Sequence, residues 1–536
     1  MTARQLPARP SLEQLKRQAK ELLHAAQSGD SSALARLRAL PAFATATDTA
    51  LARAPLALHD AQSVIAREHG FDSWNTLRER VEELTLEFDA AVTQFIEAAT
   101  DGRSDRAARL LALHPAIATA NFHTALLLGD ASTVEQRLAA DPSLATKPGG
   151  PRDWEPLHYI CHNSVRHDTN ATRDGAVAIA RALIERGADP NTRFPWEHHG
   201  VHRPVLWGAV CNTRSLPLAA ALLELGADPN DGVTLPIAAS GGNLDALELL
   251  HAHGADANQP WATDGSATLY AILHWAAGPA GPVWLLDHGA NADPVFPATG
   301  ETPLHVVAAR WDARLAELLA NHGADITRRR ADGRTPYAVA ELSGNRDVAA
   351  WLLAHGAHDD MSNADRLVAA CSRGDGTAAR AMLAANPALR AELGAAYNTA
   401  YNDALIKAAE RGDTQVLETM LSCGFDPNIG DDEIGKTPLH AAAMEGWPDA
   451  VRVLLAHGAS PAARDKEFHG TPLVWAAEGC RSRKDDGRDH AAVGRLLLDA
   501  GSPADWQSGE EPAQTVLDIL AEWQRSALTD MPEMAG

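Results

Sequence analysis

A five-residue phrase, Gly-Ala-Asp-Pro-Asn, recurs along this chain of 536 residues and constrains its fold more than any other feature. The phrase begins at Gly187 and Gly226, and variants begin at Gly254, Gly289, Gly323, Gly356, Gly424, Gly458 and Gly501. The spacing is mostly near the roughly 33 residues typical of proteins built from small repeated units. We therefore expect a stack of similar units, because a single unit of this size cannot bury its own apolar face.

A second phrase precedes most copies of the first and predicts the start of a helix. It reads Thr-Pro-Leu-His at Thr302 and Thr437, with related forms at Glu155, Thr335 and Thr471. A threonine hydroxyl can accept hydrogen bonds from free backbone N–H groups at a helix start, and proline suits the first turn, where its missing N–H costs nothing. The glycine phrase predicts a helix end, because glycine adopts the left-handed conformation found there. Each unit is thus predicted to be helix, turn, helix and loop.

Together the two phrases, with leucine pairs such as Leu318-Leu319 in the second helix, resemble those of the ankyrin-repeat family. The resemblance is strong from about Trp154 to Asp505, and weaker units precede that stretch. It implies an all-α solenoid of about twelve helix-turn-helix units. It also implies that histidines of the helix-start phrase, such as His305, form hydrogen bonds within and between units, and that the concave groove and the loop tips form the binding surface.

The repeat pattern divides the chain into five predicted segments. These are a small N-terminal helical domain (1–85), degenerate repeats (86–147), regular repeats (148–360), further repeats with a degenerate first unit (361–506), and a C-terminal capping helix and tail (507–536). The first segment opens with a capping box from Ser11 to Gln14 and resembles the leader of a group of bacterial ankyrin-repeat proteins. That resemblance implies no activity, and we expect the leader to add stability.

Composition argues against several classes of function. The formal charge of −23, from 70 acidic and 47 basic residues, disfavours nucleic acid and favours a partner of basic character. Five widely spaced cysteines without a Cys-x-x-Cys pair predict neither a disulfide framework nor a zinc site. The absence of a signal peptide and of any apolar run of about 18 residues predicts no membrane segment and a cytoplasmic location. We find no nucleophile with its base and no phosphate-binding glycine loop, so no catalytic residue, metal or cofactor is expected.

Aromatic residues near the helix starts of three nearby units are the first candidate binding residues. Aligned on the helix-start phrase, the position after the histidine holds Tyr159, Trp207 and Trp275. This position lies about 200° around the helix from the core leucine of the phrase, on the face that lines the groove in ankyrin-repeat proteins. Exposed aromatic residues on a rigid scaffold are typical of binding hot spots. The alternative is that these rings pack between adjacent first helices.

A loop rich in tryptophan and histidine, over residues 194–207, adds Trp196, His198, His199 and His202 to the candidates. Imidazoles can bind zinc, but no cysteine pattern supports a four-coordinate site, so we predict a polar loop without metal. The function we predict is a non-catalytic scaffold or adaptor that recognises a protein partner. Two alternatives remain open, namely small-molecule binding in an aromatic pocket and an enzyme that uses this loop.

Overall fold

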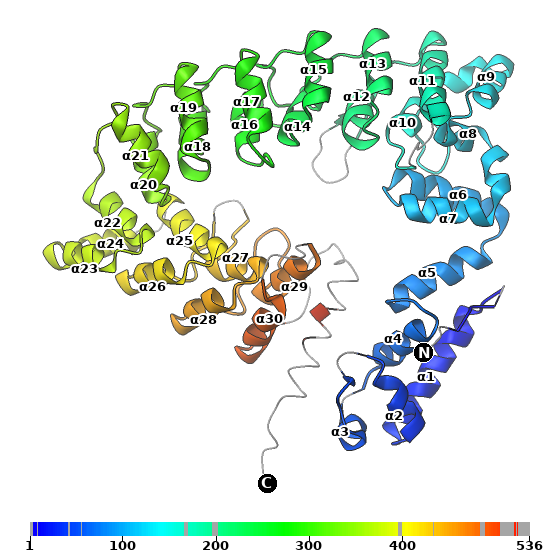
Figure 1. Cartoon of the computed structure of the whole chain (residues 1–536), viewed down its shortest axis with the longest axis horizontal. Helices are drawn as coiled ribbons and strands as arrows, with labels where there is room; N and C mark the ends of the chain where they lie inside the picture. The colour runs from blue at the N-terminus through cyan, green and yellow to red at the C-terminus, as the bar shows by residue number, and fades with distance from the viewer. Residues whose placement is uncertain are drawn as a thin grey trace. The chain divides into compact units, whose positions relative to one another are not determined.

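The computed structural model shows a predominantly helical chain (Figure 1). The chain forms two compact units. Unit 1 comprises Met1–Leu40 and Leu56–Phe296, and unit 2 comprises Pro41–Pro55 and Pro297–Gly536. The structure describes residues 4–7, 9–40, 43–54, 56–165, 170–195, 202–394, 399–431, 434–482, 488–503, 519–520 and 523. Within these ranges the only sheet has two short strands, and no helix is long and apolar enough to span a bilayer.

Five helices precede the repeats. They are α1 (Leu12–Gln27), α2 (Ser31–Leu37), α4 (Leu58–Glu68) and α5 (Trp74–Thr85) in unit 1, and α3 (Asp48–Arg53) in unit 2. The Ser11 hydroxyl accepts a hydrogen bond from the Gln14 N–H at 3.3 Å, which confirms Ser11 as the N-cap of α1, the first half of the predicted capping box. Leu15, Ala19 and Leu22 recur at helical spacing and are buried, and this stripe is the face on which α1 packs against α4.

Paired helices fill the rest of unit 1. The pairs are α6 (Phe88–Thr100) with α7 (Ser104–Leu113), α8 (Phe122–Leu128) with α9 (Ala131–Ala140), α10 (Pro156–Cys161) with α11 (Asn170–Glu185), α12 (Val205–Trp207) with α13 (Leu216–Glu224), α14 (Thr234–Ser240) with α15 (Leu244–Ala252), and α16 (Thr268–Leu273) with α17 (Ala280–Asp287). Shorter elements are the 3-10 helices η2 (Pro115–Thr119) and η3 (Pro142–Ala145), the π-helical continuation of α12, η4 (Gly208–Asn212), and strands β1 (Arg193–Pro195) and β2 (His202–Pro204). First helices such as α14 and α16 pack on one another, and second helices such as α11 and α13 form a parallel row.

Unit 2 continues the same pattern. Its pairs are α18 (Pro303–Arg310) with α19 (Ala313–Asn321), α20 (Pro336–Leu342) with α21 (Arg346–Ala354), α22 (Asn363–Ser372) with α23 (Gly376–Ala385), α25 (Thr399–Arg411) with α26 (Thr414–Cys423), α27 (Pro438–Glu445) with α28 (Pro448–Ala456), and α29 (Pro472–Ser482) with α30 (His490–Asp499). A single helix, α24 (Leu389–Gly394), follows α23. The described residues of the two units thus contain twelve helix pairs, and the predicted helical repeat solenoid is confirmed.

The glycine and the asparagine of the recurring glycine phrase each have a structural role in the stack. Gly289 ends its unit with φ at +86°, a conformation that a residue with a side chain adopts only under strain. The Asn258 side chain accepts a hydrogen bond from the Asn291 N–H at 2.7 Å and donates one to the Gly289 carbonyl at 2.9 Å. Equivalent bonds from Asn191 and Asn230 link the preceding loops. The asparagine of one phrase therefore holds the backbone of the next.

The helix-start phrase makes a second kind of link between units. His440 Nδ1 lies 2.8 Å from the Thr437 hydroxyl and accepts a hydrogen bond from the Thr437 N–H at 3.3 Å. On the other side of the ring, Nε2 donates to the Gly470 carbonyl of the following unit at 3.1 Å. His305 makes the equivalent bonds to Thr302 and to the Arg334 carbonyl. For His305 and His440, these bonds confirm that the histidine of the phrase connects residues within and between units.

The hydrophobic core of unit 2 is continuous through the degenerate repeat. Its buried residues run from Leu342 through Leu367 and Tyr401 to Trp523. The Tyr401 hydroxyl donates a 2.9 Å hydrogen bond to Asp365, which ties α25 to α22 inside this core. At the C-terminal end, the Trp523 ring lies against Gly494 of α30, where an added Cβ would approach the ring to 2.2 Å.

Candidate functional site

Two of the three aromatic residues predicted to line a groove are buried in unit 1. The Tyr159 ring is inaccessible, and its hydroxyl donates to the Gly149 carbonyl at 2.7 Å and accepts from the Arg152 N–H at 3.2 Å. Trp207 is 8% exposed and stacks on the His162 ring at 5.6 Å between ring centroids. Neither ring offers an open face to a partner. The alternative, packing inside the stack, describes both residues.

Two of the three aromatic residues do not occupy the helix position that the sequence alignment assigned to them. The register predicted from the helix-start phrase is correct for Tyr159, which follows His158 in the first turn of α10. In α12, however, Trp207 itself occupies the histidine position, the third residue of the helix. In α16 that position belongs to Tyr270, and Trp275 follows the end of the helix. The sequence alignment shifted in these two units because neither begins with Thr-Pro, and His274-Trp275-Ala-Ala imitates the phrase.

Buried histidines complete the interior cluster around Trp207. His162 lies between His158 and Trp207, with ring centroids 6.0 and 5.6 Å away. Burial lowers the pKa of His158 to about 4. Burial first, and then the neighbouring His158 and Arg203, hold the pKa of His162 well below its ordinary value. Both rings are therefore neutral near pH 7, as expected of packed side chains.

The third predicted aromatic residue forms the exposed site that we assign as the candidate. Trp275 is 44% exposed, and its ring lies 5.7 Å from that of Trp261. Trp261 belongs to the loop before α16, whose ends are held by a bridge between Pro260 and Ala267 and by a hydrogen bond of 2.8 Å from the Trp261 N–H to the Ser266 carbonyl. The pair thus joins the loop tip to the end of the first helix.

The loop after α17 adds apolar surface at the same helix. Phe296 stacks on Tyr270 of α16 with ring centroids 5.1 Å apart and planes inclined by 14°. Its neighbour Val295 is 46% exposed. The loops before α16 and after α17 therefore each place an aromatic ring against this unit, Trp261 against Trp275 just after α16 and Phe296 against Tyr270 in α16. We call the four residues Trp261, Trp275, Val295 and Phe296 the α16 patch.

The sequence analysis missed Trp261, Val295 and Phe296 because it considered only the position after the helix-start histidine and the tryptophan- and histidine-rich loop over residues 194–207. A signal was available for Trp261, which stands directly after proline in a loop otherwise made of small and polar residues. An aromatic residue has no local reason to occupy such a loop unless it packs on a neighbour or binds a partner.

The tryptophan- and histidine-rich loop begins and ends in a β-hairpin. Strand β1 pairs with β2 antiparallel, with Arg193 opposite Pro204 and Pro195 opposite His202. His202 is exposed on β2. Trp196, His198 and His199, and with them the enzyme and metal hypotheses for this loop, lie outside the described residues. Across the described part of the chain, no group of three or more His, Cys, Asp or Glu side chains is arranged to hold a metal.

Comparison with known proteins identifies the class of repeat. A profile of the family described as "Ankyrin repeats (3 copies)" matches residues 273–365 and 405–508. The ankyrin repeat and KH domain-containing protein mask-1 of Caenorhabditis elegans is 28% identical over 231 residues, which are 42% of this chain and 8% of that protein. The chain therefore contains ankyrin repeats.

Shorter matches involve proteins of different kinds. The 2-5A-dependent ribonuclease of Mus musculus is 41% identical over 75 residues, 14% of this chain and 10% of that protein. The ankyrin repeat and SOCS box protein 6 of Mus musculus is 35% identical over 82 residues, 15% of this chain and 20% of that protein. The chain thus aligns with a fifth or less of each of these relatives. The human ASB11 ankyrin repeat domain superposes with a TM-score of 0.33 at 24% identity, covering 45% of this chain and 99% of that domain.

Proposed function

We propose that this protein is a non-catalytic scaffold that binds a protein partner through the α16 patch and the neighbouring loop tips. A stack of ankyrin repeats supports this function, since its units form a rigid, extended surface on which loops and first helices repeat at fixed spacing. The hydrogen bonds of Asn230 and Asn258 to the following loops reduce the freedom of those loops. Less conformational entropy is then lost when a partner binds.

The observation that carries the proposal is the exposure of Trp275 beside Trp261. A tryptophan with nearly half its surface in water is costly for solubility and is a side chain enriched among binding hot spots. Val295, the neighbour in sequence of the Phe296 that stacks on α16, adds exposed apolar surface in the loop after α17. A partner with an apolar anchor residue suits this patch, and basic residues around that anchor would be attracted by the net charge of −23.

Affinity capture with a matched pair of variants tests the proposal. The intact protein, Trp275→Ala and Leu244→Ala are each used to capture proteins from lysate of the source organism, and the captured proteins are identified by mass spectrometry. Leu244 is the control because it is 45% exposed, as Trp275 is, but lies at the start of the second helix α15. We expect a protein retained by the wild type and by Leu244→Ala and lost with Trp275→Ala. Equal retention by all three would refute a role for the α16 patch.

A further inference from the structure

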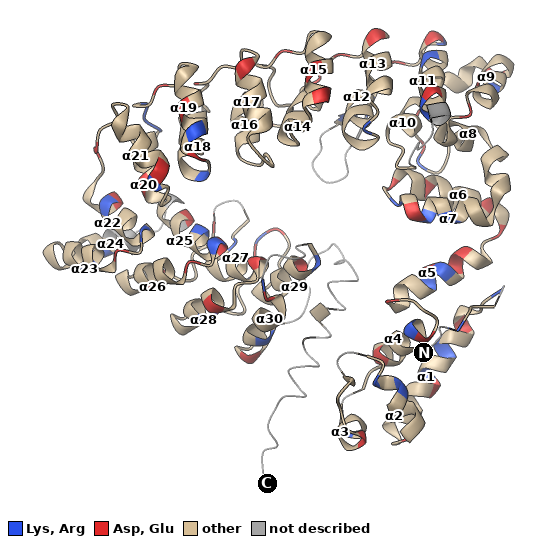
Figure 2. Ribbon diagram, in the orientation of Figure 1, with Lys and Arg blue, Asp and Glu red and all other residues tan. Residues whose placement is uncertain are grey.

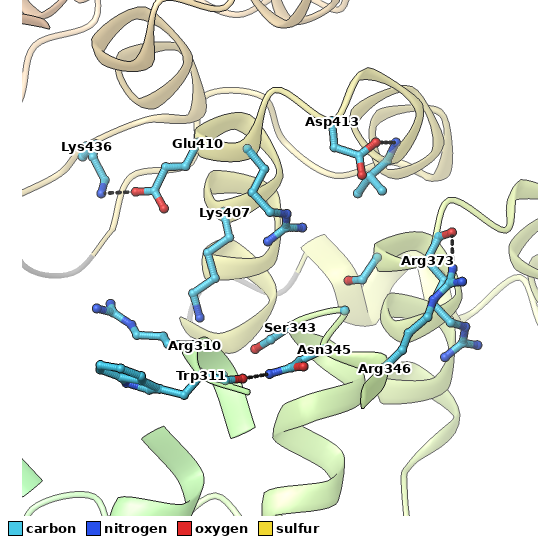
Figure 3. A pocket seen from close by; sticks show the side chains of 15 residues that line it. Arg310, Trp311, Ser343, Asn345, Arg346, Arg373, Lys407, Glu410, Asp413 and Lys436 are labelled. Atoms are coloured by element: carbon cyan, nitrogen blue, oxygen red, sulfur yellow. Dashed lines mark hydrogen bonds and ion pairs between the residues drawn. The ribbon is translucent and has the colours of Figure 1, made fainter. Parts of the chain in front are cut away.

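Unit 2 contains a cavity of about 780 Å³ that the scaffold function does not use (Figure 3). Its walls come from the turns between the two helices of four successive pairs, from α18–α19 to α25–α26, together with side chains of α25 and Lys436. Six cationic side chains and two carboxylates line it, namely Arg310, Arg346, Arg373, Lys407, Arg411 and Lys436 against Glu410 and Asp413. Two of these cations are paired, Arg373 with Glu341 and Lys436 with Glu410, and the lining still holds more positive than negative side chains although the whole chain carries −23. Figure 2 shows the basic residues of α18 and α25 that contribute to it.

The arginines occupy related positions in successive repeats. Arg310 ends α18, Arg346 begins α21, Arg373 caps α22 and Arg411 ends α25. Each therefore stands at the turn between the two helices of its unit. Stacking the units brings turns that are far apart in sequence to one cavity. Each of the four units thus contributes one arginine from the turn between its helices. Surface charges scattered at random would not recur at related positions of successive units.

Hydrogen bonds between the turns hold the cavity walls. The Asn345 side chain donates to the Trp311 carbonyl at 2.7 Å, and the Ser372 hydroxyl donates to the Leu342 carbonyl at 2.8 Å. The Arg346 guanidinium donates to the Arg373 carbonyl at 3.0 Å, which leaves its other N–H groups available to a ligand. The walls are thus positioned without a ligand.

Lys407 is the central cation. Its side chain extends from α25 towards Arg310 and Ser343 on the opposite wall (Figure 3). Within the described part of the chain, its ammonium group makes no hydrogen bond or ion pair, whereas Lys436 pairs with Glu410 at 2.7 Å. Burial lowers the pKa of Lys407, and Arg310 and Arg411 lower it further, while Asp403 and Glu410 oppose the shift. Asp403 thus offsets part of the cost of burying this ammonium group, and an anion bound in direct contact with it would offset more.

We propose that this cavity binds a small soluble compound that carries two or more phosphate groups. Several converging cations match the charge of linked phosphates, and guanidinium groups bind phosphate oxygens in a bidentate manner. The volume lies in the range of pockets for small ligands. The Trp311 side chain at the edge of the cavity gives a planar ring of the ligand a surface for stacking.

Calorimetric titration of the full chain with tripolyphosphate, ATP and citrate at physiological salt tests this site. Tripolyphosphate and ATP are expected to bind, and citrate, a polycarboxylate, is expected to bind at least about tenfold more weakly. If ATP binds more tightly than tripolyphosphate and this difference disappears in Trp311→Ala, the ring of the ligand stacks on Trp311. If the two compounds bind equally tightly, the cavity recognises the phosphate groups alone. Failure of both phosphate compounds to bind at millimolar concentration, or equally tight binding of citrate, overturns the proposal.

Three variants separate this cavity from general attraction to positive charge. Lys407→Met and Arg411→Gln should each weaken tripolyphosphate binding by about tenfold or more, because each removes a charge-assisted contact. Arg452→Gln is the control, since Arg452 lies outside the cavity, pairs with Asp449 on α28, and gives the same change in net charge. Arg411 is exposed, so its replacement tests the site even if Lys407→Met does not fold. An equal loss with Arg452→Gln, or no loss with Arg411→Gln, contradicts the assignment.

Discussion

The histidine of the helix-start phrase should make the stability of unit 2 depend on pH. His305 is completely buried, and its hydrogen bonds require the neutral ring with the proton on Nε2. Burial, with a smaller contribution from the charge of Arg330, lowers its pKa to about 4, although the bond to the Arg334 carbonyl opposes the shift. The unfolded chain has the ordinary histidine pKa of about 6.5.

Because the pKa of His305 is lower in the folded than in the unfolded chain, the folded state becomes less stable as the pH falls. Above about pH 7 the ring is neutral in both states, and His305 adds no pH dependence. As the pH falls from 6.5 towards 4, the unfolded chain takes up a proton that the folded chain does not, so the folded state loses stability. The loss between pH 7 and pH 5 is about 2 kcal/mol, and it reaches about 3.4 kcal/mol when the pH falls below 4.

Urea unfolding of wild type and His305→Ala, followed by circular dichroism at pH 7 and pH 5, measures this contribution. Alanine is a suitable replacement because Ala338 already occupies the same position in the next unit. The variant should be less stable at pH 7, since it lacks the bonds to Thr302 and Arg334, but it should lose about 2 kcal/mol less than wild type between pH 7 and pH 5. An identical pH-dependent loss in the two proteins would refute the reasoning.

Two further variants test the packing of unit 1. Gly281→Ala should destabilise the fold by about 1–3 kcal/mol in thermal or urea unfolding, because a Cβ there would lie 1.8 Å from the Ala239 carbonyl oxygen and force α17 away from α14; an unchanged stability would show that the helices separate freely. Tyr159→Phe should cost about 1–2 kcal/mol through loss of the bonds to Gly149 and Arg152, without affecting partner capture. Loss of capture in that variant would place Tyr159 in the binding surface after all.

The backbone frame was predictable from the sequence because each repeat carries its own signals. Thr437 caps α27 and Gly289 ends its unit in the left-handed conformation, as the two phrases indicated. Local chemistry determines these features, so a short window of sequence is sufficient to find them. The register failed where the signals weaken, as at Thr268, which begins α16 without a following proline.

The surfaces were less predictable because they depend on residues brought together by stacking. Net charge favoured a basic partner, yet Arg310, Arg346 and Lys407 converge on one positively charged cavity. The contact between Trp261 and Trp275 likewise joins two residues of which one precedes α16 in the sequence and the other follows it. The arginines could have been found in the sequence, because they recur at the turns between the helices of successive units. The net charge could not reveal them, because it is summed over the whole chain and does not depend on where each charge lies.

Hydrogen–deuterium exchange of the full chain with and without its captured partner is the most direct test of the central claim, that a protein partner binds at the α16 patch. We expect the partner to slow exchange in residues 260–275 and in the loop that carries Val295 and Phe296. Protection confined to the second helices α13, α15 and α17, with no change at residues 260–275, would contradict the account.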